Sequence, residues 1–382
     1  MNPINVSQLF SESQLFSQGM QAGEFTFLAQ DARGPNGTVG ELRTAAEHTR
    51  RTLANIDATL KGAGQSLENL VNLSVFLADY ADAPAIAEVL RSTFDREHPA
   101  VNFVGVCGLE GDCRVCMDAL ATTSTDRETI SVADMPTSIG ARCHGYRVGD
   151  FVFLSGVDAL DANGRIAAPA TIQSQTTEVL TRIGKILNQQ KLGLGNLCRT
   201  FMFIPGTQYR PGYGEARKAI YNGIFAEDEF PPNSGIYVRS LGSDVLLRSM
   251  AIAYRGERRI VTSPKVRLAP GSFSQSVRVG DWLLLAGQDA VTFDRAVECE
   301  GSLAGQTEAT LRHTKDIVEA AGGTLDDIVK TTVYLGDVSD YAGMNEVYRR
   351  YFPSGPPARA TLITGFVVPG LLVEIEAIAA LD

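Results

Sequence analysis

The sequence predicts an α+β fold made of three tandem copies of one ββαβαββ unit. The first observation is a strand motif that occurs three times, as AGEFTFLAQDA, VGDFVFLSGVDA and VGDWLLLAGQDA, with opening glycines Gly23, Gly149 and Gly280 that are 126 and 131 residues apart. The second is a late strand that keeps nearly the same step, as CMDALA, RSMAIA and EIEAIA. Because a third of the 382 residues is about 127, units of this period fill the whole chain.

Each copy is predicted to run through the same elements in the same order. Two opening strands lead into a polar turn, such as residues 33–37 (RGPNG). A long amphipathic helix follows; in the third copy it covers Leu303–Ala321 and ends at Gly322–Gly323, since glycine favours helix ends. A strand (IVKTTVYLGD), a second helix (through NEVYRRYF) and two closing strands (ARATLITGF and LLVEIEAIAAL) complete the unit. We expect domains at residues 1–126, 131–256 and 261–382, joined by short linkers near 126–131 and 256–261.

The free face of each sheet predicts how the copies assemble. Two helices cover one face of a small mixed sheet, and an apolar second face left bare would aggregate. We therefore expect the three sheets to pack their free faces together around a pseudo-threefold axis. The chain would then be a monomeric pseudo-trimer, with a higher homo-oligomer left open.

Composition excludes several classes of partner. The formal net charge is −10 and no run of Lys or Arg opposes it, so we expect no nucleic-acid partner. No stretch has the ~18 apolar residues of a membrane span, and the N-terminal residues do not resemble a secretory signal. Six cysteines in a chain this long are too few for a disulfide framework, which favours a reducing, cytoplasmic setting.

The third copy resembles the Rid family, also called YjgF-like, whose fold is chorismate-mutase-like. The motifs that carry the resemblance are LLAGQ at 284–288, DIVKTTVYL at 327–335, PARAT at 357–361 and VEIEAIA at 373–379. The match is weaker in the second copy and faint in the first. The resemblance implies a trimeric arrangement with ligand sites in the clefts between neighbouring units. It also implies hydrolysis of reactive imines and enamines to ketones and ammonia, with no metal and no cofactor.

Residue by residue, the resemblance points mainly to the third copy. Arg359 matches the family's carboxylate-binding arginine, and Glu374 matches the glutamate thought to position the attacking water. Asn345 matches the helix asparagine, Ala286–Gly287 the small-Gly pair, and Phe273 stands where the family has a tyrosine. A guanidinium can hold a carboxylate with two hydrogen bonds, so we expect Arg359 to anchor the substrate while Glu374 aims a water in the same site. The alternative is an internal ion pair between the two.

The other copies have diverged at these positions. Ser234 and Val101 replace the arginine in the second and first copies. In the second copy Arg248 takes the glutamate position, Lys218 the asparagine position and Arg142 the tyrosine position. If these three cations converge on one cleft, they favour a substrate with more than one carboxylate. Otherwise they belong to a solvated or ion-paired face.

Cys116 takes the glutamate position in the first copy and is a candidate nucleophile. Arg114 lies two residues before it on the same strand face, and a nearby cation lowers the pKa of a thiol. The alternative is a small buried hydrophobic side chain. Cys113 and Cys116 have the spacing of zinc ligands, but residues three apart on a strand face opposite ways, so we predict no metal site.

The sequence thus favours a cofactor-independent hydrolase of the deaminase type. Its substrate would be an imine, an enamine or a related small carboxylate, bound in a cleft between units around Arg359. Two alternatives remain: a chorismatase-like enzyme of the same fold, and a non-catalytic ligand-binding or scaffold protein, because a fold does not decide its chemistry.

Overall fold

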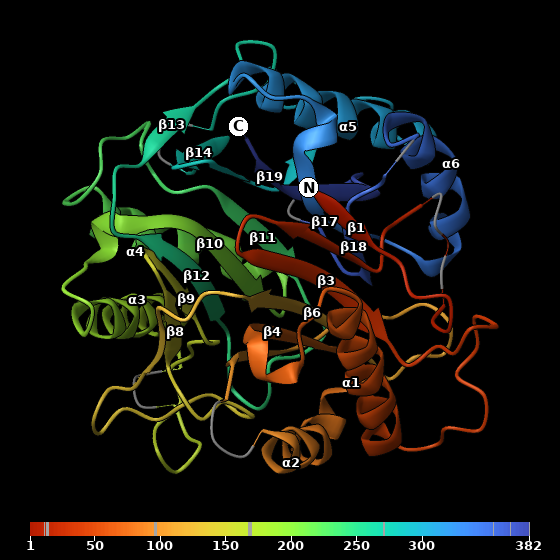
Figure 1. The fold of residues 1–382 in the computed structure, drawn as a ribbon. Helices are drawn as coiled ribbons and strands as arrows, with labels where there is room; N and C mark the ends of the chain where they lie inside the picture. The colour runs from red at the N-terminus through yellow and green to blue at the C-terminus, as the bar shows by residue number, and fades with distance from the viewer. Residues whose placement is uncertain are drawn as a thin grey trace.

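The computed structural model contains the three predicted units (Figure 1). Each unit is a mixed β-sheet, with antiparallel and parallel strand pairs, and two helices on one of its faces. It describes residues 1–10, 12, 15–94, 98–166, 170–269, 272–353, 355–366 and 368–381. The first sheet has the strand order β1-β2-β3-β6-β4-β5. Its elements are β1 (Asn2–Ile4), β2 (Gly19–Ala22), β3 (Phe25–Asp31), α1 (Ala45–Gly62), β4 (Leu70–Leu77), α2 (Ala83–Thr93), β5 (Ala100–Gly105) and β6 (Val115–Thr122).

The second and third units repeat this plan. Their sheets have the orders β11-β10-β12-β9-β8-β7 and β13-β14-β15-β19-β17-β18. The second unit contains β7 (Arg127–Ile130), β8 (Gly145–Val148), β9 (Phe151–Leu154), α3 (Ile172–Asn188), β10 (Leu197–Ile204), α4 (Arg210–Tyr221), β11 (Asn233–Tyr237) and β12 (Arg248–Tyr254). The third contains β13 (Arg259–Val261), β14 (Ser276–Val279), β15 (Trp282–Leu285), β16 (Gln288–Asp289), α5 (Leu303–Ala320), β17 (Ile328–Leu335), α6 (Tyr341–Tyr351), β18 (Ala358–Ile363) and β19 (Val373–Ala380).

The predicted linkers are strands rather than loops. β7 pairs with β8, and β13 pairs with β14, each at the outer edge of the sheet that follows it in the chain. The segments between the predicted domains therefore belong to the second and third sheets. Each is only three or four residues long, too short for sequence periodicity to separate a strand from a loop.

Local chemistry explains where the first helix of each unit begins and ends. Thr44, Thr171 and Ser302 are the N-cap residues, and each side-chain hydroxyl accepts a hydrogen bond from the backbone amide three residues on. In the third unit α5 ends at Ala320, and Gly322 follows with φ +90°, a conformation that glycine adopts readily. The glycine stop read from the sequence is therefore confirmed. No helix in the described part of the chain has the length and apolarity that a membrane crossing requires.

The free faces of the three sheets meet at a common centre, with the helix pairs α1/α2, α3/α4 and α5/α6 on the outside (Figure 1). The aromatic residue that follows each opening turn marks that centre: Phe25 packs its ring 5.7 Å from that of Phe151 and 5.5 Å from that of Trp282. These three positions are equivalent in the repeat, so they are related by the predicted pseudo-threefold axis. The intramolecular pseudo-trimer is confirmed.

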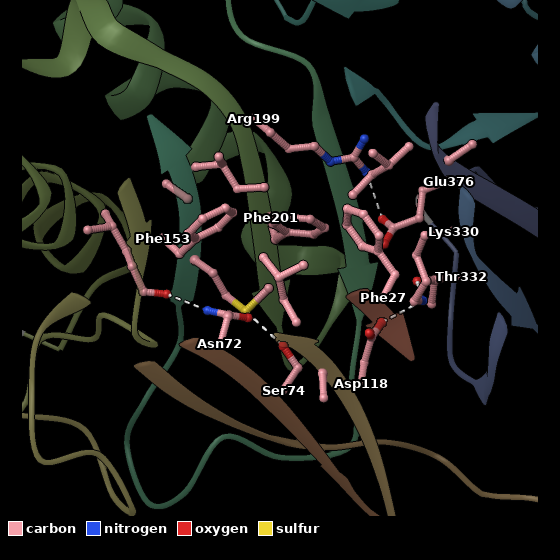
Figure 2. Close-up of a pocket in the computed structure, with 18 of the residues that line it drawn as sticks. Phe27, Asn72, Ser74, Asp118, Phe153, Arg199, Phe201, Lys330, Thr332 and Glu376 are labelled. Atoms are coloured by element: carbon pink, nitrogen blue, oxygen red, sulfur yellow. Dashed lines mark hydrogen bonds and ion pairs between the residues drawn. The ribbon is translucent and has the colours of Figure 1, made fainter. Parts of the chain in front are cut away.

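Charged residues also meet around this axis, lining a central cavity of about 90 Å³ (Figure 2). Arg199 of the second unit pairs with Glu376 of the third at 2.9 Å, and Lys330 of the third pairs with Asp118 of the first at 2.7 Å. The strand registers make Arg199, Lys330 and Asn72 equivalent, and likewise Glu376, Asp118 and Met250.

The third position of this ring is uncharged. Asn72 of the first unit donates to the Leu154 carbonyl at 3.5 Å, and Met250 of the second accepts from the Ser74 hydroxyl at 3.2 Å. Around the central cavity, two of the three interfaces are therefore joined by ion pairs and the third by neutral side chains, which distinguishes these three positions chemically.

Candidate functional site in the clefts between units

Arg359 and Glu374 lie on opposite faces of the third sheet, so the predicted single site is wrong. Arg359 is paired in register with Thr331 of β17, whose hydroxyl is 2.7 Å from the Tyr348 hydroxyl on the helix side of the sheet. Glu374 is paired with Tyr334, three residues farther along β17. Because successive strand residues point to opposite faces, positions 331 and 334 face opposite ways. The two side chains therefore enter different clefts.

Arg359 lies in the cleft between the third and first units. It is 5% exposed, stacks over the rings of Tyr348 and Phe16, and donates from Nη2 to the Tyr341 hydroxyl at 3.3 Å. Its Nε and Nη1 have no hydrogen-bond partner among the residues described. The cavity here is only about 40 Å³, well below the ~300 Å³ of a typical small-molecule site.

Cys116 lines this same cleft, but the prediction that it is an activated nucleophile is not supported by its surroundings. Burial raises the pKa of its thiol well above the ordinary range, with the Asp31 carboxylate as the next cause. Arg114, expected to lower that pKa, is instead paired with Asp82 at 2.7 Å. A buried thiol with a raised pKa is a poor nucleophile at neutral pH, so the alternative interpretation as a buried apolar side chain is favoured. No group of three or more His, Cys, Asp or Glu suited to a metal ion occurs within the described ranges.

Two of the three cations predicted in the second copy, Arg248 and Arg142, lie in the cleft between the first and second units. There they form hydrogen bonds and an ion pair with other residues of the protein. Arg248 is fully buried, pairs with Asp158 at 2.7 Å and donates to the Tyr80 hydroxyl at 2.8 Å. Arg142 donates to the backbone carbonyl of Arg91 at 3.1 Å. Lys218 lies elsewhere, so the expected convergence of these three cations on one cleft is wrong. Arg248 and Arg142 face the first unit, whereas Lys218 lies in the cleft with the third unit.

The cleft between the second and third units is much larger, about 540 Å³. It brings together four residues predicted from the sequence: Glu374, Gly287 and Phe273 of the third unit and Lys218 of the second. Ala286 is buried next to Gly287, and Asn345 is buried on α6 outside this lining. This cleft is in the size range of small-molecule sites, so it is the candidate active site.

Glu374 is the central acid of this cleft. It is 6% exposed, and β19 pairs with β16 so that Glu374 is directly opposite Asp289. Gly287 leaves the space that the carboxyl fills, because a Cβ at that position would overlap Glu374 Oε1. Burial raises the pKa of Glu374 well above its usual range, and the nearby carboxylates of Asp289 and Glu376 raise it further. Burial and the neighbouring carboxylates thus favour the protonated form of this carboxyl at the base of the cleft.

Comparisons with known proteins agree with this architecture. The family model described as Endoribonuclease L-PSP matches residues 8–123, 133–255 and 265–381. The chain belongs to this family, the Rid family. It is 36% identical over 122 residues to a RutC family protein of Pyrococcus abyssi, a match that covers 32% of this chain and 96% of the relative. It is 34% identical over 122 residues to the human 2-iminobutanoate/2-iminopropanoate deaminase, covering 32% of this chain and 89% of that protein.

A solved structure shares the fold of most of this Rid-family chain. A chorismatase crystal structure superimposes with a TM-score of 0.63 and 16% sequence identity, covering 82% of this chain and 93% of the other. At this level of identity the likeness concerns the fold alone.

Several cleft residues of this Rid-family protein were not anticipated from the sequence. They are Asp289, Arg267, Arg210 and Arg217. A signal for Asp289 was present, since an Asp-Ala pair ends the opening strand motif of all three units. Arg210 and Arg217 are seven residues apart on α4 and so lie on one helix face. Nothing local to Arg267 shows that it faces this cleft.

The raised pKa of Glu374 predicts how stability depends on pH. Its proton is held more tightly in the folded protein than in the unfolded chain, so stability is lost as pH rises above the ordinary glutamate pKa of 4.5. Glu374→Gln removes this loss because the amide stays neutral. We expect the denaturant midpoint of the variant, relative to that of the wild type, to increase as the pH rises from about 4 to about 8. A constant difference across that range would contradict the raised pKa of Glu374.

Proposed function

We propose that this Rid-family protein hydrolyses a small carboxylate-bearing imine or enamine in the cleft between its second and third units. The observation that carries the proposal is the buried Glu374 carboxyl, with its raised pKa, at the base of a cleft of about 540 Å³ lined by cations of both units. The cations bind the substrate carboxylate. Gly287 has no side chain and so leaves room for the carboxyl group of Glu374. The names of the related deaminases support this class of reaction.

The chemistry follows from the neutral acid. Glu374 donates its proton to the nitrogen of an imine, or to the β-carbon of an enamine, and gives an iminium ion. A water adds to the iminium carbon while the Glu374 carboxylate takes a proton from it. Proton transfer to nitrogen then lets the carbinolamine expel ammonia and leave a ketone. The net reaction consumes one water, forms a carbon–oxygen bond and breaks the carbon–nitrogen bond, and it needs no oxidant or reductant.

The test is the decay of 2-iminopropanoate generated by an amino-acid oxidase. We expect Glu374→Gln to lower kcat/KM by about 10²-fold or more, the range for loss of a general acid–base group. Arg359→Met should keep most of the activity, because Arg359 lies in the other cleft. Circular dichroism and the melting temperature of each variant check that both fold. Loss of activity in Arg359→Met with activity retained in Glu374→Gln would overturn the assignment of the cleft.

A chorismatase-like reaction is the second candidate. Protonation of an enol ether at its methylene carbon needs the same neutral acid in a cation-lined cleft, and the fold likeness to a chorismatase extends over most of the chain. Pyruvate release from chorismate, followed by a coupled lactate dehydrogenase assay, would favour this reaction. Saturable carboxylate binding without turnover of either compound would favour the non-catalytic alternative.

The remaining properties are proposals of the same kind. All six cysteines are free, which agrees with a reducing, cytoplasmic setting. Because one chain supplies all three units, we expect a monomer of 41.0 kDa in solution.

A further inference from the structure

The cations around Glu374 identify a class of substrate. We propose that this cleft selects substrates with two carboxylates over monocarboxylic ones of the same length. The inference rests on the proposed function for its reaction and on the charge and geometry of the two cleft walls for its selectivity.

One wall is the face of α4 in the second unit. Arg210, Arg217 and Lys218 all line the cleft from this helix. Residues seven or eight apart are about two turns apart, so the cations at the two ends of this row are separated by about 10–12 Å along the helix. A row of that length has room for a second carboxylate beside the one near Glu374.

Arg217 is a fixed donor within this wall. It is 5% exposed, stacks over the rings of Tyr213 and Tyr221, and donates from Nη2 to the Ser272 carbonyl of the third unit. Its Nε has no partner in the described part of the chain. A buried guanidinium nitrogen without a partner favours an acceptor brought by a ligand.

The opposite wall belongs to the third unit and carries Arg267. Its Nε is likewise buried without a partner among the described residues. Among the nearby charges, Arg267 lowers the pKa of Asp289 the most. Arg267 therefore lies close to Asp289 and Glu374, the two acids at the base of the cleft. A carboxylate held by Arg267 would therefore place the adjacent reacting carbon near Glu374, while a second carboxylate would reach α4.

The charge balance separates this cleft from the one around Arg359. Four cations line the cleft of Glu374; Lys218 is paired with Glu227 at 3.2 Å, whereas Arg217 and Arg267 each keep a buried Nε without a partner among the described residues. In the Arg359 cleft the other cation, Arg33, is already paired with Asp31 at 2.8 Å and Glu110 at 3.0 Å. A substrate with one carboxylate could satisfy the buried Nε of Arg217 or that of Arg267 but not both, and a buried donor left without an acceptor is unfavourable.

The test compares two five-carbon imines generated in place, one from glutamate and one from norvaline, each by a suitable amino-acid oxidase. They match in length and differ in the second carboxylate. We expect kcat/KM to be at least about tenfold higher for the dicarboxylic imine, the effect of one charged hydrogen-bonded contact. Arg267→Gln and Lys218→Gln should each reduce that preference mainly through KM. Lys185→Gln, an exposed lysine on α3 away from the cleft, is the matched control.

Binding separates the failure of this inference from the failure of the proposed function. Equal kcat/KM for the two imines would overturn the selectivity while leaving the reaction intact. If neither imine is hydrolysed, calorimetry with 2-oxoglutarate and 2-oxopentanoate measures the same selectivity without catalysis. Tighter binding of 2-oxoglutarate, weakened in Arg267→Gln, would support the inference; equal binding of the two acids would overturn it.

Discussion

Arg199→Met is expected to lower the free energy of unfolding by about 3–5 kcal/mol, the range observed when one partner of a buried ion pair is removed. Arg199 is 1% exposed and pairs with Glu376 across the interface of the second and third units. Without the guanidinium, the Glu376 carboxylate stays buried beside the central cavity with no counter-ion. The urea midpoint of the variant, compared with that of the wild type, measures the loss.

Two further variants show whether the charge or the packing is responsible. In Arg199→Met with Glu376→Met, both charges are replaced by apolar side chains of similar length, so most of the lost stability should return. Asn72→Leu alters the equivalent neutral position in the first unit and should change stability by about 1 kcal/mol at most, since it removes one weak hydrogen bond. A single Arg199→Met variant as stable as the wild type would show that the ion pair does not hold these units together.

Gly287→Ala is expected to reduce kcat/KM for the proposed hydrolysis by about 10²-fold, close to the effect of losing the general acid itself. A methyl group at this position would overlap Glu374 Oε1. The overlapping atom is the far end of a flexible side chain, so the carboxyl can move aside and the fold can be retained. The prediction is therefore a large loss of activity with a small change in melting temperature.

The matched control is Gly184→Ala on α3. Its added Cβ would lie 4.0 Å from the Leu194 Cγ, an ordinary contact, and alanine in a helix is favoured over glycine. We expect activity like that of the wild type and an equal or higher melting temperature. If Gly287→Ala keeps full activity while Glu374→Gln loses it, the position of the carboxyl is less restricted than the structure indicates.

The sequence by itself determined the repeated unit and the order of its elements. Those features depend on short-range patterns: apolar residues at strand or helix spacing, hydroxyl N-caps such as Thr171, and a glycine after α5. The family resemblance of the third unit follows from the same local motifs. It also predicted Glu374, Gly287, Phe273 and Lys218 as candidate site residues, and the structure brings these four into one cleft.

Only the tertiary structure decided which residues of neighbouring units line the same cleft. Arg359 and Glu374 belong to the same sheet but enter different clefts, because their strand registers point them to opposite faces. The cations of the candidate site come from α4 of one unit and from Arg267 of the next, a juxtaposition set by the direction in which the units wind around the axis. Sequence periodicity reports which face of an element is buried, whereas the pairing of distant faces depends on the packing of the whole chain.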